Sequence, residues 1–155
     1  MNTPATRMQL DPQRTTLTIE SAAGLVVEIG YRSVAERFLR HDPPTPGELE
    51  SAIDGVEDAL MAARAQRVDA GTLLVISDDI RRLLPGLLPD GTGATLVEVE
   101  ARFQRLASAS LGHPGVLANL PLGPEAAAAL LILRECMHHL GFARLMIAQA
   151  PADAG

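Results

Sequence analysis

The stretch Pro-Pro-Thr-Pro-Gly-Glu-Leu at residues 43–49 marks the start of a long helix. Thr45 can cap the free amides, Pro46 has the fixed φ suited to a first turn, and Glu48 completes a capping box. Apolar residues then recur at helical spacing, which predicts a helix that runs to about Gln66. Its acids are expected on the solvent side; they are Glu48, Glu50, Asp54, Glu57 and Asp58.

Upstream of this helix, residues 15–29 alternate β-branched and polar side chains around a break at Ala23-Gly24. This pattern predicts two strands joined by a tight turn. The segment 31–40 fits either a short helix or an extended link, and its periodicity does not decide between them. Residues 1–13 and 150–155, which are rich in proline, alanine and polar residues, are expected to be disordered tails.

Downstream, the apolar run at 72–76 predicts a buried strand, followed by a short helix at 80–84 and a loop through the glycines near residue 91. A second capping box, Thr95 to Glu98, opens a helix that runs to about residue 108. Gly123 precedes a helix that is apolar on nearly every face and ends at Gly141; residues 144–147 then form a strand. Short strands that alternate with helices indicate a single α/β domain, residues 14–149, with a short mixed sheet and packed helices.

Composition excludes several classes of function. The chain of 155 residues carries a net charge of −6, and all thirteen of its basic residues are arginine. An acidic chain with almost no aromatic residues does not suit nucleic-acid binding. A single cysteine forms no internal disulfide, and no apolar run approaches the roughly 20 residues of a membrane helix. A cytoplasmic protein that contacts neither nucleic acid nor membrane is expected.

Three groups of residues could bind a phosphorylated ligand. Ser77, Asp78 and Asp79 follow a buried strand, where carboxylates can bind Mg²⁺, but the same residue types also cap helices. The loop through Gly91, Thr92 and Gly93 precedes a helix, but it lacks the pattern and the lysine of a phosphate loop. Paired arginines could hold an anion, or they could form surface salt bridges; these are Arg81 and Arg82.

Cys136, His138 and His139 lie late on the apolar helix. Cys136 and His139 are three residues apart and could share a face, but two ligands do not make a zinc site. Histidines near a helix C-terminus also interact favourably with the helix dipole. We therefore expect a structural role for these residues and no metal.

Residues 34–49 (VAERFLRHDPPTPGEL) resemble a stretch in the second domain of the exopolyphosphatase/guanosine-pentaphosphate phosphatases. Residues 95–106 and 128–147 are similar, in the same order, to a later helix and to a buried helix with its following strand. The resemblance implies a ribonuclease-H-like domain of the actin-like ATPase superfamily. In that family two such domains clasp a phosphorylated substrate.

This chain departs from the family at its phosphate loops. A DxGGGSTE-type loop should precede residues 27–30, but residues 17–24 read LTIESAAG, where Glu20 and Ser21 are the only polar pair. The later loop, expected near residues 75–79, also lacks its glycines. At this chain length we expect the family's first domain to be missing, and no catalytic residue transfers position by position.

The leading hypothesis is a non-catalytic binding or regulatory domain without a cofactor, whose partner is plausibly a second copy in a homodimer. The first alternative is a reduced Mg²⁺-dependent phosphohydrolase that uses Glu20, Asp78 or Asp79. The second is a sensor of a phosphorylated small molecule that uses Arg81 and Arg82.

Overall fold

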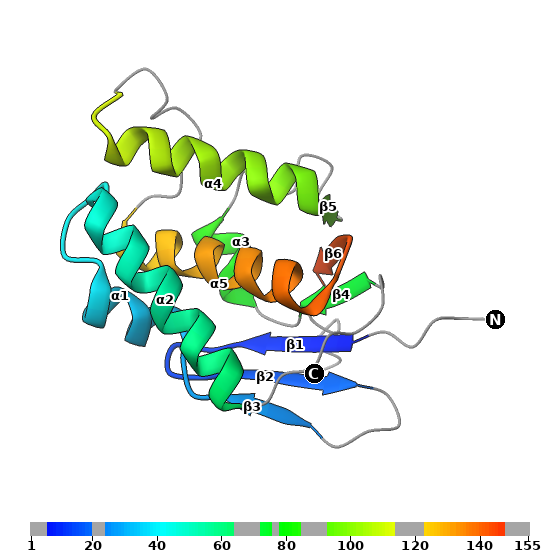
Figure 1. Ribbon diagram of the computed structural model, residues 1–155. Coiled ribbons are helices and arrows are strands. Elements are labelled where there is room, and N and C mark those ends of the chain that lie inside the picture. Colours follow the sequence, from blue (N-terminus) through cyan, green and yellow to red (C-terminus); the bar gives the residue numbers. More distant parts are fainter. Residues whose placement is uncertain are drawn as a thin grey trace, which may run out of the picture.

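A mixed sheet of six strands forms the centre of the protein, in the order β3-β2-β1-β4-β6-β5 (Figure 1). The computed structural model describes residues 6–19, 24–63, 72–75, 78–84, 93–113 and 123–147. The strands are β1 (Thr6–Leu10), β2 (Thr15–Ile19), β3 (Leu25–Val27), β4 (Thr72–Val75), β5 (Gly93–Thr95) and β6 (Arg144–Ile147). β1, β4 and β6 run parallel, whereas β2 is antiparallel to β1 and β3, and β5 is antiparallel to β6. The predicted hairpin and the predicted mixed sheet are confirmed.

β1 corrects the prediction of a disordered tail at residues 1–13. It lies between β2 and β4, with Met8 and Leu10 fully buried and Arg7 and Gln9 exposed. This is the period-two pattern of a strand with one buried face. It was missed because it extends over only five residues, between Pro4 and Pro12, in a polar segment. The other predicted tail positions, 1–5 and 150–155, lie outside the described residues.

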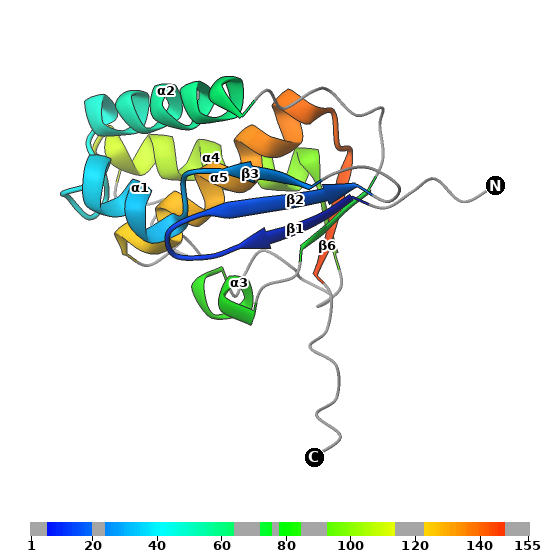
Figure 2. The same ribbon diagram turned by 90° about the horizontal axis from the view of Figure 1, so that it is seen from below.

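Five helices pack with this sheet: α1 (Tyr31–Phe38), α2 (Pro46–Ala62), α3 (Asp78–Leu83), α4 (Leu96–Ser110) and α5 (Pro124–Leu140). In Figure 2, α1, α2, α4 and α5 lie together on one side of strands β1 to β3, and α3 lies on the other. The segment that could have been a helix or a link is therefore the helix α1. No described helix is both long enough and apolar enough to cross a membrane.

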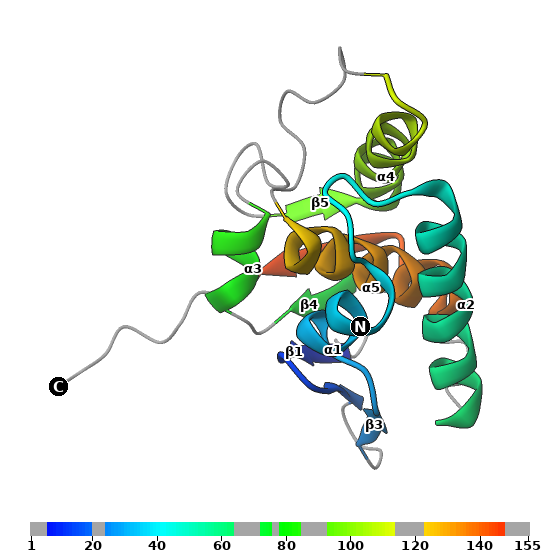
Figure 3. The ribbon, with the colours of Figure 1, turned by 90° about the vertical axis from the view of Figure 1, so that its left-hand side faces the viewer.

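α5 is the central helix and contacts each of the other four (Figure 3). Residues 126–133 are all buried, as expected for a helix that is apolar on nearly every face. Gly141 ends α5 in the left-handed conformation with φ 84°, which glycine adopts without steric cost. The sequence-based prediction for this helix is confirmed at both ends.

Both predicted capping boxes are present. Thr45 Oγ1 accepts from the amide of Glu48 at 3.2 Å, and Glu48 Oε1 accepts from the amide of Thr45 at 2.9 Å. Thr95 and Glu98 make the same reciprocal pair at the start of α4, at 3.1 and 3.0 Å. These bonds satisfy amides that a helix N-terminus would otherwise leave without partners.

Gly93 opens β5 and is not part of a loop, which corrects the prediction for residues 93–95. A Cβ atom on Gly93 would lie 2.8 Å from the carbonyl oxygen of Leu145 in β6. The glycine therefore permits close approach of two strand backbones. This requirement accounts for Gly93 without a ligand.

Candidate functional site

The carboxyl ends of β1 and β4 define the first candidate site. The two strands are parallel and adjacent, so the turn after β1 and the helix after β4 emerge at the same edge of the sheet. α/β proteins commonly bind ligands at this edge. Here it brings together the turn at residues 11–14, the start of α1, and α3.

Tyr31, the first residue of α1, is joined to α3 at this edge. Its buried hydroxyl donates to Asp79 Oδ2 at 2.5 Å, and Arg82 Nη2 donates to Asp79 Oδ1 at 3.4 Å. Burial, followed by the contact with the Asp79 carboxylate, raises the pKa of Tyr31 to about 12. The Tyr31 hydrogen bond in turn lowers the pKa of Asp79. Asp79 is therefore an ionised carboxylate with one donor on each of its oxygens.

The N-terminus of α1 is closed by the turn after β1. The amide of Tyr31 donates to the carbonyl of Asp11 at 3.3 Å, and the amides of Arg32 and Ser33 donate to the carbonyl of Pro12 at 2.9 and 3.1 Å. Helix N-termini bind anions through such amides. In this protein two backbone carbonyls already occupy them.

A salt bridge on the surface closes the other side of this edge. Arg32 Nε donates to Glu125 Oε1 in the first turn of α5 at 2.9 Å, with both side chains partly exposed. Arg32 and Arg82 thus each face a carboxylate. α1 is joined to α5 by this ion pair and to α3 by the hydrogen bond from Tyr31 to Asp79.

The other residues proposed from sequence are only partly placed. Arg81 and Arg82 are exposed on α3, and their role toward an anion stays a prediction. Asp78 begins α3, but its side chain lies outside what the structure describes. Four further candidates also lie outside the described residues: Glu20, Ser77, Gly91 and Thr92.

A second polar cluster lies between α2 and α5. His139 Nε2 is 3.1 Å from Glu135 Oε2 on its own helix and 3.3 Å from Glu57 Oε1 on α2. Among the described residues, these three side chains form the group of His, Cys, Asp or Glu whose ligand atoms lie close enough together to hold one metal ion. Of the acids expected on the solvent side of α2, Glu57 is partly exposed and also contacts α5, whereas Glu48 is mostly covered, with 14% of its side chain exposed.

The cluster does not include Cys136, which the sequence grouped with His139. Cys136 is 1% exposed, and burial raises the pKa of its thiol to about 12. A neutral, buried thiol is a poor ligand and a poor nucleophile, as expected. Glu135 was missed, although a single carboxylate four residues before a histidine on an apolar helix was a usable signal.

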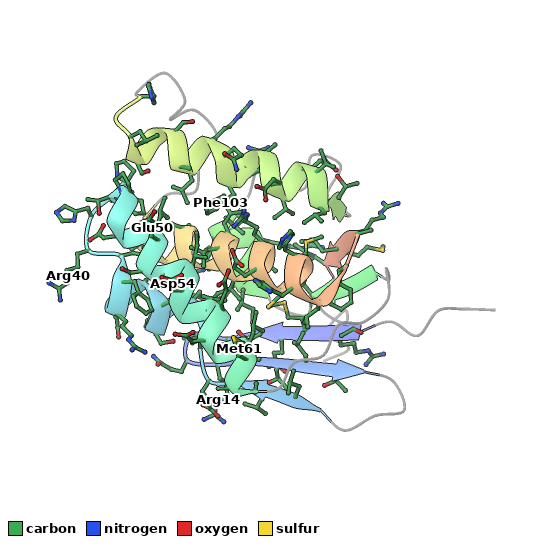
Figure 4. All side chains as sticks on the ribbon, in the orientation of Figure 1. Arg14, Arg40, Glu50, Asp54, Met61 and Phe103 are labelled. Atoms are coloured by element: carbon green, nitrogen blue, oxygen red, sulfur yellow. The ribbon has the colours of Figure 1, made fainter. Side chains whose placement is uncertain are left out.

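The buried carboxylate of Glu135 is held by Arg134. Arg134 Nη1 donates to Glu135 Oε1 at 2.7 Å, and Arg134 Nε donates to Glu100 Oε2 on α4 at 2.6 Å. The guanidinium also stacks on the ring of Phe103, 4.1 Å from its centroid. Figure 4 places Phe103 between α4 and α5. Arg134 on α5 is thus joined to α4, and Glu135 and His139 connect the same cluster to Glu57 on α2.

Comparison with solved structures identifies the fold. The Aquifex aeolicus PPX-GPPA enzyme superposes with a TM-score of 0.69 and 13% identity, over 96% of this chain and 54% of that one. The fold of this chain is that of about half of a Ppx/GppA phosphatase. An exopolyphosphatase-like protein gives a TM-score of 0.71 and 16% identity over 96% of this chain and 56% of that one. An exopolyphosphatase from Cytophaga hutchinsonii gives a TM-score of 0.64 and 15% identity over 94% of this chain and 53% of that one.

The resemblance inferred from residues 34–49 is therefore confirmed at the level of the fold. The chain spans about half the length of these Ppx/GppA structures, which is consistent with a match to their C-terminal domain alone. No protein-family model and no curated protein matches the sequence. The likeness to these phosphatases is therefore seen in the fold, and the function of the site depends on the geometry of this chain.

Proposed function

We propose that this chain is an exopolyphosphatase-related binding or regulatory domain that does not cleave phosphate. Under this proposal the fold is that of the ribonuclease-H-like domains of the actin-like superfamily, which the likeness to the Ppx/GppA structures supports. The observation that carries the proposal is the closed N-terminus of α1. Its first three amides donate to the carbonyls of Asp11 and Pro12.

Phosphate binding at a sheet edge uses backbone amides with space in front of them. A Cβ atom on Gly30, just before α1, would collide with the backbone of Asp11 and Pro12, so there is no room for an anion. Pro12 also has no N–H of its own to offer. The ionised Asp79 beside them adds a negative charge that repels phosphate.

A phosphate-release assay tests the proposal. The substrates are polyphosphate, guanosine pentaphosphate and an aryl phosphate, each with Mg²⁺ or Mn²⁺. We expect no release above the protein-free background. Metal-dependent turnover that a point substitution at the sheet edge removes would contradict the proposal.

The second candidate function is a reduced Mg²⁺-dependent phosphohydrolase. The observation that favours it is the ionised carboxylate of Asp79 at the carboxyl edge of the parallel strands, where a metal could bind. Asp78 or Glu20 would complete the ligand set. Under this hypothesis Asp79→Asn and Asp78→Asn abolish turnover, whereas Asp54→Asn on the exposed side of α2 leaves it unchanged.

We further propose that a binding partner is a second copy of the chain. The support is that each matched Ppx/GppA structure contains about as much chain again as the part matched here. Light scattering at tens of micromolar tests the proposal. A dimer mass is expected, and a strictly monomeric mass would contradict the proposed homodimer.

A further inference from the structure

The cluster between α2 and α5 combines three side chains that ligate metals: Glu57, Glu135 and His139. We propose that they bind one divalent transition-metal ion of the zinc type. The site would join the middle of α2 to the end of α5. It is separate from the sheet edge and does not depend on the proposed function.

The spacing of the donor atoms fits one ion. Zinc bonds of about 2.0–2.2 Å to nitrogen and oxygen place two ligands of a tetrahedral ion roughly 3.3–3.6 Å apart. His139 Nε2 lies 3.3 Å from the Glu57 oxygen and 3.1 Å from the Glu135 oxygen, and all three donor atoms lie within 4.8 Å of one another. The two distances from His139 thus lie within a few tenths of an ångström of the spacing around one ion.

A second shell already orients the least mobile ligand. Glu135 is 2% exposed, and Arg134 holds its Oε1 at 2.7 Å while its Oε2 is directed toward His139. Arg134 is itself fixed by Glu100 and by the ring of Phe103. Partners of this kind, which fix a ligand through its second atom, are a general feature of metal sites.

The charge of the cluster also suits a dication. Arg134 donates to both Glu100 and Glu135, and it contributes one positive charge against the three carboxylates of Glu57, Glu100 and Glu135. With a neutral His139 the group has an excess of two negative charges. A divalent ion would balance this excess.

The donor set selects the class of metal. An imidazole nitrogen with two carboxylates suits zinc and related transition metals, whereas Mg²⁺ prefers oxygen ligands alone. The side chains of His139 and Glu57 are 40% and 39% exposed, so the fourth position faces solvent and can hold water. A proton on His139 could bridge the same two carboxylates, so the test must measure metal binding itself.

Calorimetric titration of the full chain with ZnCl₂ and with MgCl₂ provides that test. We expect one Zn²⁺ per chain, and binding weakened by roughly 10-fold or more in His139→Gln and in Glu57→Gln. Both residues are partly exposed, so the variants should fold, which circular dichroism checks. His138→Gln alters the exposed neighbour of His139, and Asp54→Asn alters an acid one turn before Glu57 (Figure 4). Both controls are expected to bind as the wild type does.

Co²⁺ provides a second measurement, because a tetrahedral cobalt site absorbs strongly in the visible range. The wild-type chain should acquire these bands and His139→Gln should not. The proposal is overturned if the wild type binds no Zn²⁺, if the two ligand variants bind it as tightly as the controls, or if Mg²⁺ binds equally well.

Discussion

Gly30 is the position where a single methyl group most directly tests the closed N-terminus of α1. Its backbone is extended, with φ −136° and ψ 175°, so alanine is conformationally allowed. The Cβ atom of Gly30→Ala, however, would overlap the backbone of Asp11 and Pro12. Because backbone atoms cannot rotate away as a side chain can, the turn must move away from the helix.

That movement breaks the bonds from the first three amides of α1 to the turn, whose lengths are 2.9 to 3.3 Å. At about 1 kcal/mol for each hydrogen bond, Gly30→Ala should lower the free energy of unfolding by about 2–4 kcal/mol. For a domain of this size, that loss corresponds to a fall in Tm of roughly 4–16 °C. Thermal melts followed by circular dichroism measure it.

Gly47→Ala is the matched control. Gly47 lies in the first turn of α2, and no atom lies within 4 Å of where its Cβ would be. Alanine there should leave Tm unchanged or raise it, because alanine has the higher helix propensity. A Gly30→Ala protein as stable as Gly47→Ala would refute the inference that the turn closes α1.

Three further predictions concern other contacts. Tyr31 is the only tyrosine and tryptophan is absent, so tyrosinate absorbance reports this group alone. It should titrate near its raised pKa of about 12 rather than 10, and the stability it contributes below pH 10 should be lost as pH rises through 12. Asp79→Asn should bring the midpoint back toward 10, and a wild-type midpoint near 10 would contradict the contact. The bond from the amide of Thr45, followed by contacts with His41 and the amide of Arg40, lowers the pKa of Glu48 from 4.5 to about 2, so Glu48 stabilises the fold above pH 4.5 and loses this effect as pH falls to 2. In urea unfolding, the difference in the free energy of unfolding between the wild type and Glu48→Gln should therefore shrink over that range. A constant difference would count against this prediction. A Cβ on Gly55 would lie 2.5 Å from the ring of Phe38, so Gly55→Ala should cost about 1–2 kcal/mol. In a Phe38→Ala background the ring is gone, so Gly55→Ala should instead stabilise the protein by up to about 1 kcal/mol through the higher helix propensity of alanine. Equal effects of Gly55→Ala in both backgrounds would exclude the clash.

The parts of the fold that were predictable from sequence depend on local chemistry. The capping boxes at Thr45 and Thr95 and the left-handed Gly141 each involve residues a few positions apart, and all three are present. Periodicity also placed the buried helix α5 and the strand β6. Two strands were missed: the five-residue alternation of β1 becomes a strand signal only through pairing with β2 and β4, and the three residues of β5 form a strand only through pairing with β6.

The polar sites could not be predicted in the same way, because their partners lie far apart in the chain. Tyr31 meets Asp79 across 48 positions, and Glu57 meets His139 across 82. Each of these residues alone has an ordinary role: an aromatic core residue, a helix cap, a solvated acid. Tyr31 and Asp79 come together because α1 and α3 both pack on α5, and Glu57 and His139 come together because α2 packs on α5.

Under the proposed function, the fold and the means of binding phosphate are separable in this protein. A hairpin turn at a sheet edge can direct either amides or carbonyls toward the following helix. Here the amide of Asp11 donates back to Arg14 within the turn at 3.0 Å, and Pro12 has no amide, so the turn offers α1 its carbonyls instead. Those carbonyls stabilise α1 by accepting from the same amides that an anion would need. On the proposed function, a chain can therefore retain the fold of a Ppx/GppA domain while the hydrogen bonds at its edge hold the fold together in place of a ligand.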